Sequence, residues 1–168
     1  MERALHPRVE VHMRRYSMSW LLACITLLAS PFVSLADDSS EVILVIAHKG
    51  VAVSSMSRDE LRPIFQTKKN TWADGSAMRA INLPDNDTLR HGFDAAVLGL
   101  DPDRVVRYWI DRKIRGGDRP PVTAPSNALM VKMVGRTPGA IGYVDSKATL
   151  DANVKVVAKI VNGQVRTP

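Results

Sequence analysis

Short apolar runs alternate with amphipathic stretches through most of the chain beyond residue 41. The run Val42–Ala47 is continuous and rich in β-branched residues, which predicts a strand buried on both faces. Shorter runs predict further strands over residues 78–83, 140–144 and 154–157. Pro120-Pro121 indicates an extended link, and Asn162-Gly163 indicates a late turn.

Capping residues and apolar stripes mark four helices between these strands. Ser57 and Glu60 form a capping box that opens a brief helix, with Pro63 inside it. Longer helices are predicted over residues 87–99, 101–116 and 126–137, each beginning at a capping side chain. The apolar side chains expected to face inward are Leu61, Ile64 and Phe65 in the first helix, Leu89, Phe93, Ala96, Val97 and Leu100 in the second, Val105, Val106, Trp109 and Ile110 in the third, and Leu129, Met130, Met133 and Val134 in the fourth. This order of strands and helices favours a compact α/β fold.

The first 36 residues have the features of a secretory signal peptide. Arg14 and Arg15 precede an apolar run over residues 20–29, and Ser34-Leu35-Ala36 supplies small residues before the expected cleavage after Ala36. The apolar run is shorter than the roughly 20 residues that span a membrane. The alternatives are an uncleaved anchor, or a lipoprotein with lipid on Cys24. Met13 is a better start than Met1, because residues 1–12 add length without helping the signal.

Export changes the composition of the predicted mature domain, residues 37–168. The whole chain has 168 residues, 45% of them apolar and 24% charged, which is ordinary for a globular domain. The net charge is +6 for the whole chain and +4 for residues 37–168, which hold 19 basic and 15 acidic side chains. Residues 37–168 contain no cysteine. We therefore expect a periplasmic domain whose mild positive charge favours anionic ligands, with nucleic acid excluded as a partner.

Motifs that carry chemistry are sparse in the predicted mature domain. His48 and His91 are its two histidines, and neither has a metal-type partner at helical or hairpin spacing. The sequence has no Gly-x-Ser-x-Gly elbow, P-loop or dinucleotide fingerprint. Asp85-Asn86-Asp87 has the acidic start of a calcium loop but lacks the later glycine and glutamate. We therefore expect no enzymatic activity, no metal and no cofactor.

Five motifs follow one another along the chain. They are Leu61-x-x-Ile64-Phe65, Trp72-x-Asp74-Gly75, Phe93, Tyr108-Trp109 and, most specific of all, Pro138-Gly139-Ala140-Ile141-Gly142-Tyr143-Val144. In this order they resemble the phosphate-binding proteins of ABC transporters, the type II periplasmic-binding-protein family, over roughly residues 42–160. The resemblance implies a mixed β-sheet flanked by helices. Because family members have two lobes around their ligand, a chain of this length resembles a single-lobe member.

The resemblance also implies roles for individual residues of the last motif. Tyr143 is expected to pack in a core strand, with direct ligand contact as the alternative. Gly142 is expected to let a neighbouring backbone approach closely. Trp72 and Trp109 are interpreted as packing aromatics rather than ligand platforms.

A departure from the family pattern concerns the ligand site. In the family, a strand arginine precedes an Asp-Gly-Ser-Gly-Thr turn, which holds the anion at a helix start. Here Thr88 matches, but Asn82 replaces the arginine, and Asp87 adds a negative charge or caps the helix itself. Arg90 either compensates or faces solvent. The ligand-binding residues that the resemblance implies are Asn86, Asp87, Thr88, Arg90, Ser126 and Asn127.

Two hypotheses for function follow. The first is an exported solute-binding-like protein that recognises phosphate or another small anion, with a link to ABC-type phosphate uptake. The second is a non-transport module of the cell envelope, derived from one lobe of the fold, with its anion site lost. In that case the domain binds an envelope protein through the face that the other lobe would cover.

Overall fold

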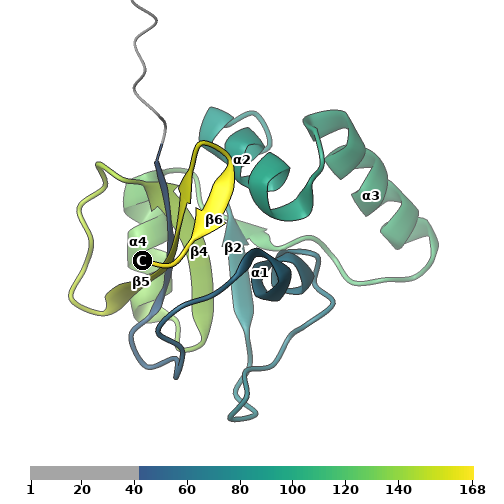
Figure 1. Cartoon of the computed structure of the whole chain (residues 1–168). Coiled ribbons are helices and arrows are strands. Elements are labelled where there is room, and N and C mark those ends of the chain that lie inside the picture. Colours follow the sequence, from purple (N-terminus) through teal and green to yellow (C-terminus); the bar gives the residue numbers. More distant parts are fainter. Residues whose placement is uncertain (1–41) are drawn as a thin grey trace, which may run out of the picture. The chain divides into compact units, whose positions relative to one another are not determined.

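The structure, a computed structural model, describes residues 42–168 (Figure 1). The predicted signal peptide, residues 1–36, and the short polar leader after it lie outside the described residues. A six-stranded sheet with the order β3-β2-β4-β1-β5-β6 forms the centre of the described part. The strands are β1 (Ile43–His48), β2 (Arg79–Asn82), β3 (Val122–Thr123), β4 (Ala140–Asp145), β5 (Val154–Val161) and β6 (Gln164–Arg166).

The sheet is mixed, as predicted from the resemblance. β2 runs parallel to both of its neighbours, β3 and β4. β1 is antiparallel to β4 and β5, and β5 is antiparallel to β6. β1 therefore lies in the middle of the sheet with a strand on each side, which explains why its sequence is apolar without alternation.

The helical segments begin where the sequence predicts caps. They are α1 (Arg58–Phe65), α2 (Thr88–Phe93), the π-helical turn η1 (Asp94–Leu98), α3 (Pro102–Ile114) and α4 (Asn127–Arg136). Ser57 and Glu60 form the predicted capping box at α1. Asp87, Asp101 and Ser126 accept backbone N–H groups at the starts of α2, α3 and α4. Gly99 ends the α2–η1 segment with a left-handed φ of 71°.

Helices cover both faces of the sheet, α4 on one side and α1 with α2 on the other (Figure 1). On the α1 and α2 side, the rings of Phe93 and Tyr143 stack with centroids 3.8 Å apart, and Phe65 meets Phe93 edge-on at 4.6 Å. Tyr143 is fully buried, so the prediction of a core strand is confirmed. On the other side, a Cβ added at Gly142 would overlap the sulfur of Met130. The closest neighbour at Gly142 is thus a side chain of α4, and the backbone approach that we expected is the carbonyl oxygen of Ile81, 3.4 Å from the same Cβ position.

The connector between α1 and β2 is held by a tryptophan. Trp72 is 7% exposed, and its Nε1 donates to the carbonyl oxygen of Gly139 at 3.0 Å. Gly139 itself has a φ of 77°, and a Cβ there would overlap the carbonyl oxygen of Ala77. The Pro-Gly turn before β4 therefore needs its glycine for two reasons, backbone conformation and close packing.

The predicted strands are incomplete near the C-terminus and at one sheet edge. β5 runs to Val161, well beyond the predicted end at Val157. The turn at Asn162-Gly163 is confirmed, with φ of 51° and 72°, but it closes a hairpin with β6, a strand that was not predicted. β3 was not predicted either, since the extended link was placed at Pro120-Pro121, just before it. Both missed strands are short and partly exposed, so they lack the apolar run that marks β1.

The inward face predicted for α3 is wrong at two positions. Val105 is buried and Trp109 packs partly against the core, but Val106 and Ile110 are each 53% exposed. The reason is that no other helix or strand of the described chain packs closely along α3. Figure 1 shows α3 at one side of the sheet and its helices. The hydroxyl of Tyr108 donates to a backbone carbonyl at the end of α1, at 3.2 Å, and helps to hold α3 in place.

Candidate functional site

Three strands end at the same edge of the sheet. Because β2, β3 and β4 are parallel, their carboxyl ends at Asn82, Thr123 and Asp145 lie at one edge. The turn after β2 leads into α2, and the segment after β3 leads into α4. In open α/β sheets, ligands bind at the carboxyl ends of the strands. Both groups of predicted ligand residues, 86–90 and 126–127, therefore lie at this edge.

The start of α2 is capped by its own carboxylate. Asp87 Oδ1 accepts the N–H groups of Leu89 at 2.9 Å and Arg90 at 3.4 Å. Asn86 and Thr88 on either side are exposed. The N–H groups that would hold an anion at this helix start are thus engaged by Asp87, as the capping alternative in the sequence predicts.

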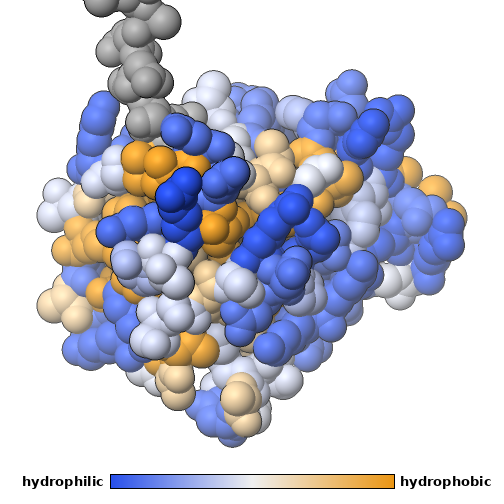
Figure 2. Space-filling view, in the orientation of Figure 1, coloured by the Kyte–Doolittle hydropathy of each residue, from blue (hydrophilic) through white to orange (hydrophobic). Residues whose placement is uncertain are grey.

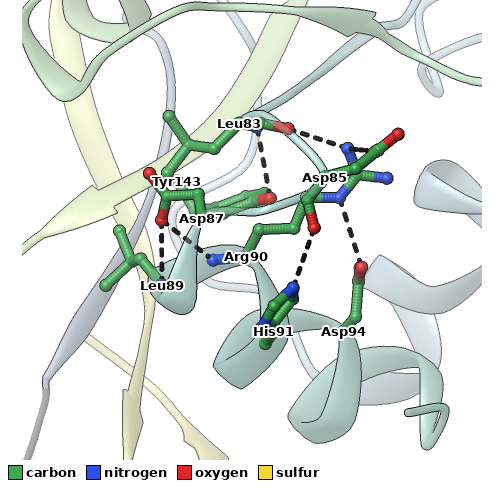
Figure 3. Close-up of polar contacts among 8 residues, drawn as sticks. All are labelled: Leu83, Asp85, Asp87, Leu89, Arg90, His91, Asp94 and Tyr143. Carbon is green, nitrogen blue, oxygen red and sulfur yellow. Dashed lines mark hydrogen bonds and ion pairs between the residues drawn. The ribbon is translucent and has the colours of Figure 1, made fainter. Parts of the chain in front are cut away.

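Arg90 is buried rather than solvent-facing, with 4% of its surface exposed. Its Nη1 donates to the carbonyl oxygen of Leu83 at 2.7 Å and lies 2.5 Å from Asp85 Oδ1. Its Nε lies 3.3 Å from Asp94 Oδ2, one helical turn further on. Figure 3 shows the guanidinium between the turn and the helix. The interpretation of Arg90 as an exposed helix arginine is therefore wrong, and its charge is already matched by two carboxylates.

Burial sets the protonation of the groups around Arg90. Burial raises the pKa of Asp94, and the Arg90 guanidinium opposes that shift. Burial also raises the pKa of Tyr143 far above its ordinary range, and the negative charge of Asp94 adds to the effect. The Tyr143 hydroxyl accepts the N–H of Leu83 at 3.3 Å, so it fixes the start of the turn. These groups hold the turn in one conformation, and the phenol stays protonated.

The start of α4 differs from that of α2 because its cap is neutral. Ser126 Oγ accepts the N–H of Leu129 at 3.3 Å, which confirms the predicted cap. Asn127 Oδ1 accepts the N–H of Asp145 at 3.4 Å and ties α4 to the end of β4. Within the described residues, the amide NH₂ of Asn127 makes no hydrogen bond, so it remains a donor at this edge.

Asn82, which replaces the family's strand arginine, is an unusual residue in the sheet. It is 3% exposed, and its Oδ1 has no hydrogen-bond partner among the described residues. Its register neighbour in β3 is Thr123. A buried acceptor without a partner is unfavourable by about 1–3 kcal/mol, so Asn82 costs stability at this position.

Asp85, Arg90 and Asp94 form a cluster, here called the Arg90 cluster, and two of its members were missing from the predicted site. Asp85 and Asp94 were not predicted as partners of Arg90, although an Arg90–Asp94 pair at i,i+4 spacing is a recognised helix signal. The burial of Arg90 and Asp94 could not be read from the sequence, because it depends on how η1 and the turn after β2 pack together, whereas Asp85 is exposed and reaches Arg90 from the surface.

The described part of the chain holds no other obvious chemistry. Between residues 42 and 168, no three His, Cys, Asp or Glu side chains come together in a way that could hold a metal ion. In the same range, every helix is too short or too polar to cross a membrane.

Solved structures share this fold. A structure of an ABC-type phosphate transport receptor from Vibrio cholerae matches with a TM-score of 0.55 and 14% identity, over 70% of this chain and 45% of that one. A structure described as a putative phosphate ABC transporter substrate-binding protein from Clostridium perfringens, with bound phosphate, matches with a TM-score of 0.55 and 17% identity, over 70% and 44%. No protein-family model matches the sequence, and no curated protein matches it.

These comparisons show the fold class that the sequence predicts. The described domain has a periplasmic-binding-protein-like α/β fold, with a six-stranded mixed sheet flanked by helices. The chain spans less than half the length of either receptor.

Proposed function

We propose that this protein is an exported recognition domain, not an enzyme, and that it binds a small anion at the carboxyl edge of β2, β3 and β4. Phosphate is the first candidate, because the structural neighbours are named for it. The observation that carries the proposal is the meeting of two helix starts, those of α2 and α4, at one sheet edge. Helix starts attract anions through their N–H groups and dipoles.

Asp87 sets the strength of this site. Its carboxylate occupies N–H groups of α2 and repels an incoming anion, so we expect the wild-type protein to bind phosphate weakly. Thr88, Ser126 and Asn127 supply neutral donors around it. The role proposed for Arg90 is indirect, since it holds Asp85 and thereby the turn.

The experiment is a calorimetric titration with inorganic phosphate of the wild type and of Asp87→Ser. Serine is as good a helix cap as aspartate, so the fold is retained while the charge is removed. We expect affinity to rise about tenfold in Asp87→Ser. Asp101→Ser is the matched control, because it makes the same change at the start of α3 and should leave phosphate affinity as in the wild type.

A second candidate is a non-transport interaction module of the envelope. The observation that favours it is that Arg90 is already engaged by Asp85, Asp94 and the Leu83 carbonyl, so Arg90 is not free to bind an anion at the start of α2. If titration with phosphate gives no heat of binding in either the wild type or Asp87→Ser, the first proposal is wrong. Cross-linking in cells would then be expected to capture an envelope protein on the carboxyl-edge face, and light scattering would report self-association.

A further inference from the structure

A large groove lies beside the Arg90 cluster, between α2, α3 and the segment that returns from α3 to β3. It encloses about 850 Å³. Asp85, Arg90 and Asp94 line one end of it, and residues 117–121 with Thr123 line the side opposite α3. Clefts of roughly 300–1,000 Å³ are the usual size for sites that bury a small organic ligand. The groove is thus far larger than a site for inorganic phosphate needs to be.

One wall of the groove is apolar. Val105, Val106, Trp109 and Ile110 face it from α3, and Pro120 and Pro121 face it from the returning segment. Figure 2 shows hydrophobic surface among hydrophilic residues over the part of the molecule that holds α3. The half-exposed Val106 and Ile110, which lack a packing partner within the described fold, therefore both face this groove.

The acidic and basic side chains around the groove differ in whether they have ion-pair partners. Its three acids are all paired: Asp85 and Asp94 with Arg90, and Asp118 with Arg112 at 3.3 Å. Lys113 and Arg119 also line the groove, and neither makes an ion pair within residues 42–168. Lys113 comes from α3 and Arg119 from the returning segment, so two unmatched cations belong to different walls of one apolar groove.

We infer that this groove binds a small amphipathic anion, a ligand with an apolar ring or short chain and one acidic group. The apolar body would cover Val106, Trp109 and Ile110, and the acidic group would lie against Lys113 and Arg119. Charge complementarity favours an anionic ligand, because the four cations at the groove, the two arginines that pair with its acids together with Lys113 and Arg119, outnumber its three acids. This site uses residues other than those proposed for phosphate, and it goes beyond that function.

The test uses the fluorescent probe 8-anilinonaphthalene-1-sulfonate, which has an apolar ring system and one sulfonate, at low ionic strength. We expect one probe per protein molecule. The double variant K113Q/R119Q should bind it about five- to tenfold more weakly. The neutral probe N-phenyl-1-naphthylamine should bind this variant and the wild type equally well. The double variant V106S/I110S should lose both probes while keeping its melting temperature, because both side chains are already exposed.

Matched controls lie on α4, on the other side of the sheet. Lys132→Gln removes an exposed cation and Leu129→Ser removes an apolar side chain that is 43% exposed. Both should bind the anionic probe as the wild type does, and inorganic phosphate should not displace it.

Three results would overturn the inference. They are unchanged binding in K113Q/R119Q, loss of binding in Leu129→Ser, and a dimer by light scattering that V106S/I110S dissociates. The last result would assign the groove to a second copy of the chain. Failure of the phosphate titration would not affect any of these measurements, so the two proposals fail separately.

Discussion

α3 and α4 have similar sequence patterns, but α4 packs against the sheet whereas most of α3 is exposed. Both are capped amphipathic helices with an apolar stripe. α4 packs across β4, β1 and β2 and buries Met130, Val131 and Val134. α3 buries Val105 alone and leaves Val106, Ile110 and Ile114 exposed, the last at 79%.

The difference shows what an apolar stripe on a helix does and does not predict. The stripe predicts that one face of the helix is apolar and is stabilised by burial, but it does not predict which surface buries it. In α4 the cover is the sheet of the same domain. In α3 the described chain supplies only part of it, and the remaining apolar face borders the groove. Contiguous exposed apolar surface of this kind is a feature of ligand-binding grooves and interaction sites.

The largest expected difference is between the buried core, represented by Phe93 of α2, and the exposed face of α3, represented by Ile110. Phe93→Ala removes one ring of the buried stack under the sheet and should lower the free energy of unfolding by about 3–5 kcal/mol. Ile110→Ala should change it by less than about 0.5 kcal/mol, because the side chain is half-exposed already. Urea denaturation of both variants measures the contrast. Equal losses would mean that α3 belongs to the folding core.

An effect of similar size concerns Arg90, which lies where the core meets the groove. Arg90→Met leaves the Asp94 carboxylate buried without its cation, and should destabilise the fold by about 3–5 kcal/mol at pH 7. Burial raises the pKa of Asp94, and loss of Arg90 removes the charge that opposes the shift.

This variant should also show a pH dependence of definite sign. A carboxyl whose pKa is higher in the folded state than in the unfolded state binds protons more readily when folded, so its penalty grows as pH rises. The Arg90→Met variant should therefore recover stability as pH falls from 7 toward the unfolded pKa of aspartate, about 3.9. Urea midpoints at several pH values measure this. Adding Asp94→Asn should abolish the recovery, and a pH-independent loss would rule out Asp94 as its cause.

The smallest effects come from equal changes to the two helix caps. Ser126→Ala removes the cap of α4 and should lower global stability by about 1 kcal/mol, because α4 is part of the core. Asp101→Ala removes the cap of α3, whose oxygen accepts the N–H of Arg104 at 2.8 Å. This change should fray α3 with little effect on the urea midpoint. A global loss from Asp101→Ala as large as that from Ser126→Ala would contradict the distinction.

Most of the scaffold was predictable because its signals are local. The β-branched run of β1, the capping box at Ser57 and the left-handed Gly99 each act through their own neighbours in sequence. β3 and β6 were missed because short, exposed edge strands depend on the strand beside them. The exposed face of α3 was missed because helical periodicity describes one helix and not its partner.

The candidate site was predictable in its place but not in its electrostatics. Thr88, Ser126 and Asn127 lie at the carboxyl edge of the sheet because they open the helices that follow β2 and β3, and capping by Asp87 was weighed from the sequence. The burial of Arg90 between two acids follows from tertiary packing, which no local pattern records. For the same reason, the groove beside α3 had no counterpart in the sequence.

The central claim is that α3 is an incompletely covered wall of a binding groove, whereas α4 belongs to the core. Amide hydrogen exchange of the wild-type protein, with and without saturating 8-anilinonaphthalene-1-sulfonate, tests it most directly. Without the probe, amides of α3 should exchange at least about 100-fold faster than those of α4, which open only by global unfolding. With the probe, exchange should slow in α3 and stay the same in α4. Equal protection of the two helices, or an α3 that does not respond to the probe, would contradict the account.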